Sequence, residues 1–448
     1  MANTYLERII EAGSVGRTFT YSVWFKRTKT GTSTQLWNLS SDDDSSKYIE
    51  IAIKSDDKLD MQFRNGTSGD NGTYIRRIPT RVFRDSNAFY HVVLRFDSTE
   101  SSADDRFRLY INGEQETSFS TSTGTIPQNY VTDLANTGGE HRIGRGAGSS
   151  SVYWDGSMSH FNFVDGVSYG ADTFGSTDAT TGEWKINTSP SISTANYGTN
   201  GFFILKNGNS VTDQSGNSHN FTVAGGTLTN TEDNPSNVFA ILNSITPSSN
   251  NNQYGGTRHF NNSGGYDMRH STLAVTTGKY YSEFKITQMS GGFTIVGIQD
   301  TNQFDDYNFL TNSSRGYGYR SDGTKGNNNS SSSFGNSFTS GDTIGVAIDL
   351  DNNKIYFSKN GVWQNSGDPT SGATGTGSAF NITDGYDYCI ATSSNDAGTD
   401  QVTDVNFGNG YFNVTAVSSA GTNASGIGIF EYDVPTGYTA LSTKGLNL

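Results

Sequence analysis

The segment Phe19-Thr-Tyr-Ser-Val-Trp-Phe25 decides the fold class of this chain. Its large apolar residues recur at every second position, which is the period of a strand with one buried face. The same alternation returns at residues 92–96 and at residues 107–111. Asn112-Gly113 follows directly and predicts a tight turn, because both residue types tolerate a positive φ. Short strands separated by tight turns predict a β-sandwich rather than a parallel sheet with crossover helices.

The carboxyl-terminal half of the chain shows the same pattern in different residues. We predict two adjacent strands at residues 280–286 and 293–298. Residues 343–350 and 354–358 flank Asp351-Asn-Asn353, which predicts a hairpin. No solenoid period recurs along the chain. The sequence therefore predicts an all-β fold class with two tandem antiparallel β-sandwiches.

The predicted domain boundary follows from the change of pattern between these halves. A length of 448 residues agrees with two or three domains. We predict a first sandwich over residues 1–228, an inter-domain segment over 229–245 and a second sandwich over 246–448. Residues 238–242 of the inter-domain segment are apolar enough to pack against a core.

The polar composition predicts long loops rather than disorder. Aromatic residues make up 12% of the chain and fall in alternating runs, so a large core can form. The Ser-, Asn- and Gly-rich stretches 248–252, 327–333 and 370–378 cannot contribute to a core, and they are predicted as loops.

Charge and cysteine content exclude several classes of protein. The chain carries 30 Lys and Arg against 44 Asp and Glu, a net charge of −14, without a basic stripe, so nucleic acid is not an expected partner. No run of about 18 apolar residues exists, so membrane insertion is not expected. Residues 1–17 lack the regions of a secretory signal. Cys389 is the single cysteine, so no disulfide can form within the chain, and folding in a reducing compartment is expected.

Several short motifs in the first half occur in a recognisable order. They are Phe19–Lys26, Tyr90–Asp97, Leu109–Gly113, Ile143–Arg145, Trp154–Gly166, Phe174-Gly175, Thr181–Lys185, Tyr197–Phe202 and Asp213–Asn217. Residues 1–225 thereby resemble a concanavalin A-like jelly roll of the laminin-G type. The succession is also similar to proteins of tailed bacteriophages, especially those of marine bacteria.

The second half resembles a SPRY (B30.2-like) sandwich. The motifs that carry this resemblance are Gly278–Phe284, Gly341–Asp349, Ile355–Trp363, Val405–Gly408 and Pro435–Leu441. The order of the two modules resembles a bacteriophage virion surface protein. Both folds host many activities, so the resemblance implies the fold more strongly than the function.

The acidic residues do not form the motif of a glycoside hydrolase. Hydrolases with the concanavalin A-like fold carry Glu-x-Asp-x-(x)-Glu on one strand, so that two carboxylates flank the scissile bond. Only Glu431-Tyr-Asp433 opens such a motif, and no second Glu follows at the required spacing. We therefore predict no catalytic residue and no enzymatic activity.

Metal binding is the one question about cofactors that the sequence leaves open. Asp42, Asp43 and Asp44 are the candidate calcium ligands, because calcium takes several hard oxygen ligands. The alternative for this cluster, and for Asp56-Asp57, Asp104-Asp105 and Asp305-Asp306, is a solvated turn. The six histidines show no zinc spacing, and Cys389 is predicted to be a small buried apolar residue. No other cofactor is expected.

Binding of sugar is the chemistry that the loops suit best. Aromatic faces, amides and carboxylates hold sugars, and they occur together in the predicted loops. The candidate glycan-binding residues are Tyr130, Tyr153, Trp154, Phe304, Tyr307, Tyr317 and Tyr319. The alternative is that about half of these aromatic residues belong to the cores, Trp154 first among them.

These predictions lead to one principal hypothesis with two alternatives. The chain is expected to be a non-enzymatic virion protein, a tail or capsid appendage that takes part in assembly and attaches to host-surface glycan. Its expected partners are capsid, tail or fibre subunits and copies of itself. It would be made in the bacterial cytoplasm and displayed on the virion surface. The alternatives are a purely structural decoration or tail protein without a ligand, and a glycan depolymerase.

Overall fold

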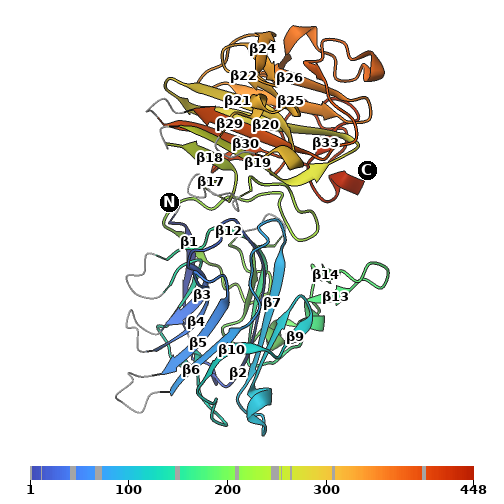
Figure 1. The fold of residues 1–448 in the computed structure, drawn as a ribbon. Coiled ribbons are helices and arrows are strands. Elements are labelled where there is room, and N and C mark those ends of the chain that lie inside the picture. The colour runs from blue at the N-terminus through green and yellow to red at the C-terminus, as the bar shows by residue number, and fades with distance from the viewer. Residues whose placement is uncertain are drawn as a thin grey trace. The chain divides into compact units, whose positions relative to one another are not determined.

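The chain folds into two compact units, each a β-sandwich (Figure 1). The computed structural model describes residues 3–11, 13–40, 47–65, 73–146, 152–206, 211–243, 252–253, 255–262, 265–304, 308–395 and 400–447. The first unit comprises residues 1–230 and 234–236, and the second comprises residues 231–233 and 237–448. Phe239 to Leu242 are buried within the second unit, as their apolar character predicts.

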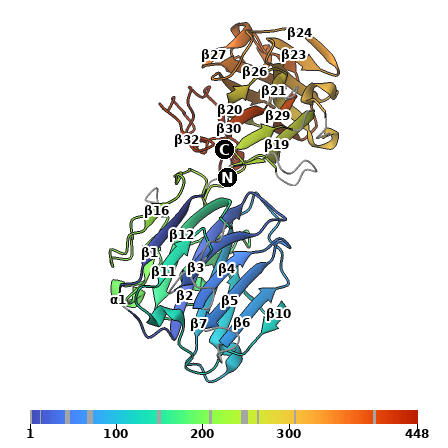
Figure 2. The ribbon, with the colours of Figure 1, turned by 90° about the vertical axis from the view of Figure 1, so that its left-hand side faces the viewer.

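One sheet of the first unit has eight strands, which Figure 2 shows side by side. In sheet order these strands are β10 (Phe119–Thr123), β6 (Thr73–Pro79), β5 (Leu59–Asn65), β4 (Lys47–Ile53), β3 (Thr34–Ser40), β11 (Glu140–Ile143), β1 (Tyr5–Ile9) and β16 (Thr222–Ala224). All of its pairings are antiparallel.

The opposing sheet has six strands and contains the three strands predicted from the alternating segments. In sheet order its strands are β15 (Phe202–Ile204), β12 (Gly156–Asp165), β2 (Thr18–Arg27), β7 (Tyr90–Asp97), β8 (Phe107–Ile111) and β9 (Glu114–Glu116). Asn112 and Gly113 turn the chain from β8 to β9 with φ of 49° and 81°. The predicted tight turn is confirmed.

The core of the first unit is rich in aromatic rings from both sheets. Phe19 stacks on Phe96 with ring centroids 4.9 Å apart and on Phe163 at 5.6 Å. Trp37 of the eight-stranded sheet packs against the same group, 6.4 Å from Phe19. Stacked and tilted ring pairs of this kind add specific contacts to the burial of apolar area. The alternating apolar residues therefore form the core that the sequence predicts.

A small two-stranded sheet, β13 (Gly175–Thr177) with β14 (Trp184–Ile186), packs on the outer side of the six-stranded sheet. Trp184 packs there with the buried Val93 of β7 and Phe174. Short helices complete the unit: η1 (Ala103–Arg106), η2 (Asp133–Ala135), η3 (Ala171–Thr173) and α1 (Thr194–Tyr197). No helix in the described ranges of the chain is long and apolar enough to span a membrane.

The larger sheet of the second unit has nine strands. Its main path is β17 (Asn252–Gln253), β18 (Arg258–Asn261), β30 (Gln401–Asn406), β20 (Lys279–Met289), β25 (Thr343–Asp349), β26 (Lys354–Lys359) and β27 (Val362–Trp363). Off this path, β28 (Phe380–Asn381) pairs with β26, and β33 (Thr439–Ala440) pairs in parallel with β20. The predicted hairpin is confirmed, because Asp349 of β25 pairs with Lys354 of β26.

The opposing sheet has six strands and carries the short helices of a long connecting loop. In sheet order its strands are β19 (Tyr266–Val275), β29 (Tyr388–Asn395), β21 (Phe293–Asp300), β22 (Gly316–Arg320), β23 (Thr324–Asn327) and β24 (Ser330–Ser333). The remaining elements of the unit are β31 (Tyr411–Phe412), β32 (Thr415–Ala416), η5 (Thr301–Gln303), η6 (Leu310–Asn312), η7 (Gln364–Ser366), η8 (Gly372–Thr374) and η9 (Gly445–Asn447).

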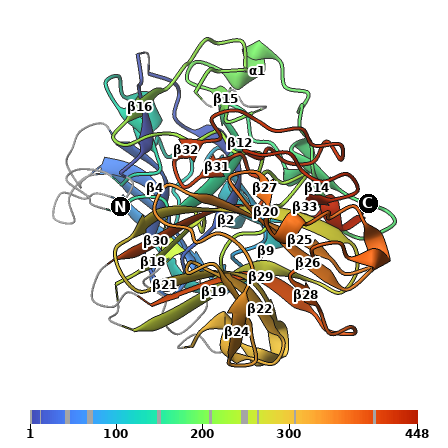
Figure 3. The same cartoon turned by 90° about the horizontal axis from the view of Figure 1, so that it is seen from above.

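Two predictions about local structure in this unit are wrong. The strands β20 and β21 follow one another in sequence but lie in opposite sheets, because the chain crosses over at Gly291-Gly292, where φ is 95° and 67°. The stretch 327–333 is not a loop throughout, since Ser330–Ser333 forms β24. All four residues of β24 are exposed at the sheet edge, where Figure 3 shows the strand, so they contribute nothing to the core.

A carboxyl-terminal segment, residues 417–438, covers the outer face of the nine-stranded sheet. Its side chains Phe430, Val434 and Tyr438 are buried against Tyr281 and Tyr356, which point outward from β20 and β26. The second unit thus has two apolar layers, one between its sheets and one beneath the covering segment.

Candidate functional site

Three of the predicted glycan-binding residues are buried, so the prediction that they are accessible to a sugar is wrong. Tyr317 and Tyr319 lie on β22 rather than on a loop and are 4% and 0% exposed. Their hydroxyl groups bond within the protein, to Thr383 Oγ1 at 2.9 Å and to the carbonyl oxygen of Asn336 respectively. Tyr130 is on a loop, but its ring packs into the first core. None of the three can offer an aromatic face to a sugar.

Tyr153 and Trp154 are half-buried and belong to one side of the first unit. Trp154 packs edge-on against Phe25 of the core at 5.5 Å. Tyr153 lies beside Tyr5, at 6.3 Å, and the guanidinium of Arg145 lies over both rings. These contacts give Trp154 the core role that the sequence leaves open and leave part of Tyr153 accessible.

Of the remaining predicted residues, one has a described contact and four lie outside the described residues. Phe304 is half-buried and stacks on His270 with ring centroids 3.7 Å apart. Tyr307 and the candidate calcium ligands Asp42, Asp43 and Asp44 lie outside the described residues. Among the side chains that are described, no three His, Cys, Asp or Glu residues gather closely enough to hold a metal ion.

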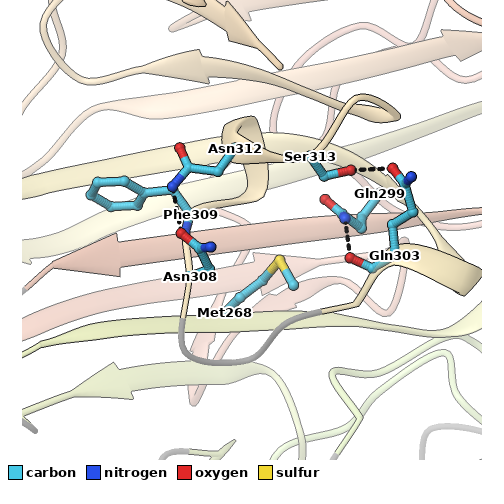
Figure 4. Close-up of a pocket in the computed structure, with 7 residues that line it drawn as sticks. All are labelled: Met268, Gln299, Gln303, Asn308, Phe309, Asn312 and Ser313. Atoms are coloured by element: carbon cyan, nitrogen blue, oxygen red, sulfur yellow. Dashed lines mark hydrogen bonds between the residues drawn. The ribbon is translucent and has the colours of Figure 1, made fainter. Parts of the chain in front are cut away.

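A polar pocket of about 220 Å³ lies where the loop after β21 crosses the outer face of the six-stranded sheet in the second unit (Figure 4). Its floor comes from the sheet, and its walls come from the loop that contains η5 and η6. The lining residues are Met268, Gln299, Gln303, Asn308, Phe309, Asn312 and Ser313. Sequence reasoning selected Phe304 and Tyr307 from this loop but missed all seven lining residues.

Glycines of β22 allow the loop to lie this close to the sheet. A Cβ atom at Gly316 would lie 1.8 Å from the carbonyl oxygen of Leu310, and one at Gly318 would lie 2.5 Å from the side chain of Ile295. The sequence Gly-Tyr-Gly-Tyr thus alternates glycines on the outer face with tyrosines in the core. This alternation was the available signal that Tyr317 and Tyr319 are core residues.

Hydrogen bonds hold the described parts of the loop, residues 301–304 and 308–315, in place. The side-chain oxygen Oε1 of Gln303 accepts from the backbone N–H of Arg315 at 2.9 Å and from the Ser313 hydroxyl. The Asn312 amide donates to Oδ1 of Asn308. Leu310 is fully buried, and its N–H donates to Ser393 Oγ of the sheet at 3.2 Å. These bonds fix the described parts of the pocket walls.

The side-chain amide of Gln299 is the group of the pocket that says most about the ligand. Its side chain is 1% exposed, and its Nε2 donates to the carbonyl oxygen of Gln303 at 2.6 Å. This bond fixes the amide so that Oε1 faces the side where Asn308 and Asn312 lie (Figure 4). Among the residues that the structure describes, Oε1 has no hydrogen-bond partner. A buried acceptor without a donor costs about 1–3 kcal/mol, so a donor group in the pocket would be stabilised there.

None of the seven described lining residues carries a charged side chain, which limits the ligands that this part of the pocket suits. The nearest ion pair, Asp300 with Arg315 at 2.5 Å, is satisfied internally, and the Arg315 guanidinium lies 4.0 Å from the centre of the Tyr386 ring. Amides and a hydroxyl around a Met side chain offer hydrogen bonds to neutral hydroxyl or amide groups. A charged ligand would find no counter-ion among the seven lining residues.

The carboxylates singled out in the sequence have structural roles. Glu431 accepts from the Ser418 hydroxyl at 2.6 Å, and Asp433 accepts from the Thr422 backbone N–H at 2.7 Å. Both bonds hold turns of the covering segment. Cys389 is buried, and burial raises the pKa of its thiol to about 12, so it is not a thiolate nucleophile at neutral pH.

Comparison with known families agrees with the two sandwiches. Residues 8–172 match the family described as the Concanavalin A-like lectin/glucanases superfamily, and residues 279–381 match the SPRY domain. The chain carries a laminin-G/concanavalin A-like domain followed by a SPRY domain. All lining residues of the pocket except Met268 fall within the matched part of the SPRY domain. Domains of these kinds indicate a binding or structural module.

Individual relatives are similar over only parts of the chain. A 91-residue stretch is 35% identical to the ATP-dependent RNA helicase DDX1 of Xenopus laevis and covers 20% of this chain and 12% of the helicase. The SPRY domain of human HERC1 is 23% identical and matches 33% of this chain and 87% of that domain, with a TM-score of 0.27. A heptameric SAP-like pentraxin from Limulus polyphemus is 17% identical and matches 37% of this chain and 70% of the pentraxin, also with a TM-score of 0.27.

Proposed function

We propose that this chain is a non-enzymatic protein exposed on a bacteriophage particle, as a tail or capsid appendage, and that it attaches to host-surface glycan. The observation that carries the glycan part is the neutral pocket of the SPRY domain with the unpartnered acceptor Gln299 Oε1. Sugar hydroxyl groups are neutral donors and acceptors, which is the chemistry that this lining offers.

A sugar residue in the pocket would make several contacts at once. Sugar hydroxyls would bond the amides of Asn308 and Asn312, and one would donate to the buried Gln299 Oε1 after the side chains that cover it shift. The half-buried Phe309 supplies apolar surface for C–H groups of the ring, above the buried Met268 at the floor. Sites for small ligands usually combine an apolar surface with a few polar groups at fixed positions.

The virion part of the proposal is supported by the order of the domains and by the motifs that resemble phage proteins. Its partners would be capsid, tail or fibre subunits, including copies of itself, and neither nucleic acid nor a membrane. The chain would fold in the bacterial cytoplasm and be displayed on the particle. A single, buried cysteine is compatible with folding in that reducing compartment.

Binding of neutral glycans tests the pocket directly. Gln299→Met keeps the length of the side chain but removes the unpartnered acceptor, so we expect at least a tenfold weaker binding of the neutral glycan that an array selects. The exposed Gln288 of β20 provides the matched control, Gln288→Met, which should bind normally. Equal binding by all three proteins, or binding of no neutral glycan by the folded wild type, would contradict the proposed glycan attachment.

The place of the protein on a particle needs a separate experiment. Antibodies raised against the purified chain should label intact phage particles at a fixed location, tail or capsid. Reconstruction of a particle should then show the SPRY pocket facing solvent. A pocket buried against neighbouring subunits would instead support the purely structural alternative, and release of sugar from host polysaccharide would support the depolymerase.

A further inference from the structure

A second surface with glycan-binding chemistry lies on the laminin-G-like domain, on the outer face of β4, β5 and β6. These strands are neighbours in the eight-stranded sheet (Figure 2). Ile49, Met61 and Ile75 point into the core and are at most 1% exposed. The alternate residues therefore point outward. They are Tyr48, Glu50, Gln62, Arg64, Tyr74 and Arg76.

The strand register arranges these residues in two rows across the sheet. Tyr48 pairs with Arg64, and Arg64 pairs with Tyr74, so one row reads Tyr–Arg–Tyr. In the next row, Gln62 pairs with Glu50 on one side and Arg76 on the other. Neighbouring strands lie about 4.8 Å apart, so the two tyrosines start from backbone positions about 10 Å apart.

Both tyrosine rings are anchored to the row beside them. The hydroxyls of Tyr48 and Tyr74 both donate to Gln62 Oε1, at 2.9 and 3.3 Å. Each hydroxyl thus reaches from its own row toward Gln62. Tyr74 is 38% exposed, and Tyr48 is half-buried, so ring surface remains open to solvent.

The Gln62 side chain is itself held by Asp60, which lies two residues before it on the same strand. Gln62 Nε2 donates to Asp60 Oδ2 at 2.9 Å, which leaves Oε1 as the acceptor for the tyrosines. Asp60 is fully buried and is held by two bonds from the Arg76 guanidinium, at 2.9 and 2.8 Å. A binding surface that is ordered before the ligand arrives loses less conformational entropy on binding. This network is therefore suited to hold two rings as a platform for sugar rings.

Among the described residues of this surface, one cation has no acidic partner. Arg76 pairs with Asp60, and Lys54 pairs with Glu50 at 2.8 Å. Arg64 lies between the tyrosines, is only half-buried and hydrogen-bonds the Tyr48 side chain, and it forms no salt bridge within the ranges that the structure describes. The net charge of the chain is −14, but distant charges are screened beyond about 8 Å at physiological salt, so the local guanidinium dominates for a bound group.

We infer that this Tyr48–Arg64–Tyr74 surface binds an acidic glycan chain. Two sugar rings of the chain stack on the two tyrosines, and a carboxylate of the chain pairs with the Arg64 guanidinium, which matches carboxylates in a bidentate manner. The inference builds on the proposed attachment to glycan but uses a site distinct from the SPRY pocket. It adds acidic sugars to the neutral ones that the pocket suits.

The test measures binding of the full-length chain to hexasaccharides of galacturonic acid, glucuronic acid and sialic acid, and to cellohexaose as a neutral probe. We expect at least one acidic hexasaccharide to bind. Arg64→Gln should weaken that binding tenfold or more, and Tyr74→Ala should do the same. Arg108→Gln is the matched control, because Arg108 is a partly exposed arginine on β8 of the opposing sheet. Far-ultraviolet circular dichroism and thermal unfolding show whether each variant is folded.

The outcomes separate this inference from the proposed function. Failure of the folded wild type to bind any acidic hexasaccharide, or equal binding by Arg64→Gln, would overturn the inference while leaving neutral binding in the SPRY pocket unaffected. Loss of acidic binding in Gln299→Met but not in Arg64→Gln would assign the acidic glycan to the pocket and also overturn it. Acidic binding that depends on Arg64, together with no effect of Gln299→Met on any glycan, would support the inference and refute the pocket.

Discussion

A single histidine shows how one buried polar residue can fix a tertiary contact. His91 of β7 is 1% exposed and lies between two indole rings, with Trp24 stacked at 4.6 Å and Trp184 at 6.0 Å. Trp184 Nε1 donates to His91 Nδ1 at 2.9 Å, so the ring is neutral and its Nε2–H donates to Ser22 Oγ, also at 2.9 Å. His91 therefore attaches the β13–β14 hairpin to the sheet through both ring nitrogens.

Replacement of His91 should change both the stability and its dependence on pH. Burial, followed by the nearby His160, lowers the pKa of His91 from 6.5 to about 3. Between these values only the unfolded state binds the proton, so this group makes the protein less stable as the pH falls below 6.5. We expect His91→Phe to cost about 1–3 kcal/mol at pH 7, through the two lost hydrogen bonds, and less at pH 5.

Urea unfolding of wild type and variant at pH 7 and pH 5 measures this effect. Trp184→Phe is the comparison, because it removes one donor but keeps the histidine, and it should leave the pH dependence of the wild type in place. A free-energy difference between wild type and His91→Phe that is the same at both pH values would show that folding does not lower the pKa of His91.

At the scale of elements, the covering segment 417–438 is held to the nine-stranded sheet by one buried carboxyl group. Glu283 points outward from β20 but is 0% exposed beneath this segment. Its oxygens accept from the backbone N–H groups of Glu431 and Tyr432, both at 2.8 Å, and from the Tyr281 hydroxyl at 3.1 Å. Burial raises the pKa of Glu283 to about 7 despite these donors, and the nearby Glu431 carboxylate adds to the rise.

Because the pKa of Glu283 is raised, we predict that its contribution to stability changes with pH in the opposite direction to that of His91. Between about pH 4.5 and 7 the folded state holds a proton that the unfolded state has lost, so stability from this group falls as the pH rises through that range. We expect the free energy of unfolding of the wild type, relative to Glu283→Gln, to decrease by about 2–3 kcal/mol from pH 4.5 to pH 7.5. Denaturant unfolding followed by the tryptophan signal measures it. Parallel pH profiles of the two proteins would contradict the raised pKa.

The alternation of residues predicts individual strands well but not the sheet to which each strand belongs. Phe19–Phe25 lies in β2 and Thr343–Asp349 forms β25, because a period of two places alternate apolar side chains on the core face. The same period is present in β20 and β21, which lie in opposite sheets. Nothing in the alternation records a crossover, because the sheet is chosen by contacts between residues far apart in sequence.

At the scale of the whole molecule, the order of two domains was predictable and the binding surfaces were not. Motifs along each half are sufficient to identify a laminin-G-like and a SPRY domain. The aromatic residues chosen for a glycan site include buried ones, since composition cannot tell a loop ring from a core ring. Gln299 was missed because its importance depends on a single unpaired oxygen, which only the packing of the loop on the sheet creates.

The two domains should unfold as separate cooperative units. Each has its own clusters of buried apolar side chains, and no described cluster combines residues of both. We therefore expect two calorimetric transitions from the full-length chain.

At pH 7, His91→Phe should lower only one of them, by about 2–4 °C for each kcal/mol lost. Raising the pH from 5 to 7 should lower the midpoint temperature of the other transition more in the wild type than in Glu283→Gln. Combining both substitutions should give additive shifts, because residues in separate cores share no contacts. A single transition that both substitutions move would instead show that the two sandwiches unfold as one.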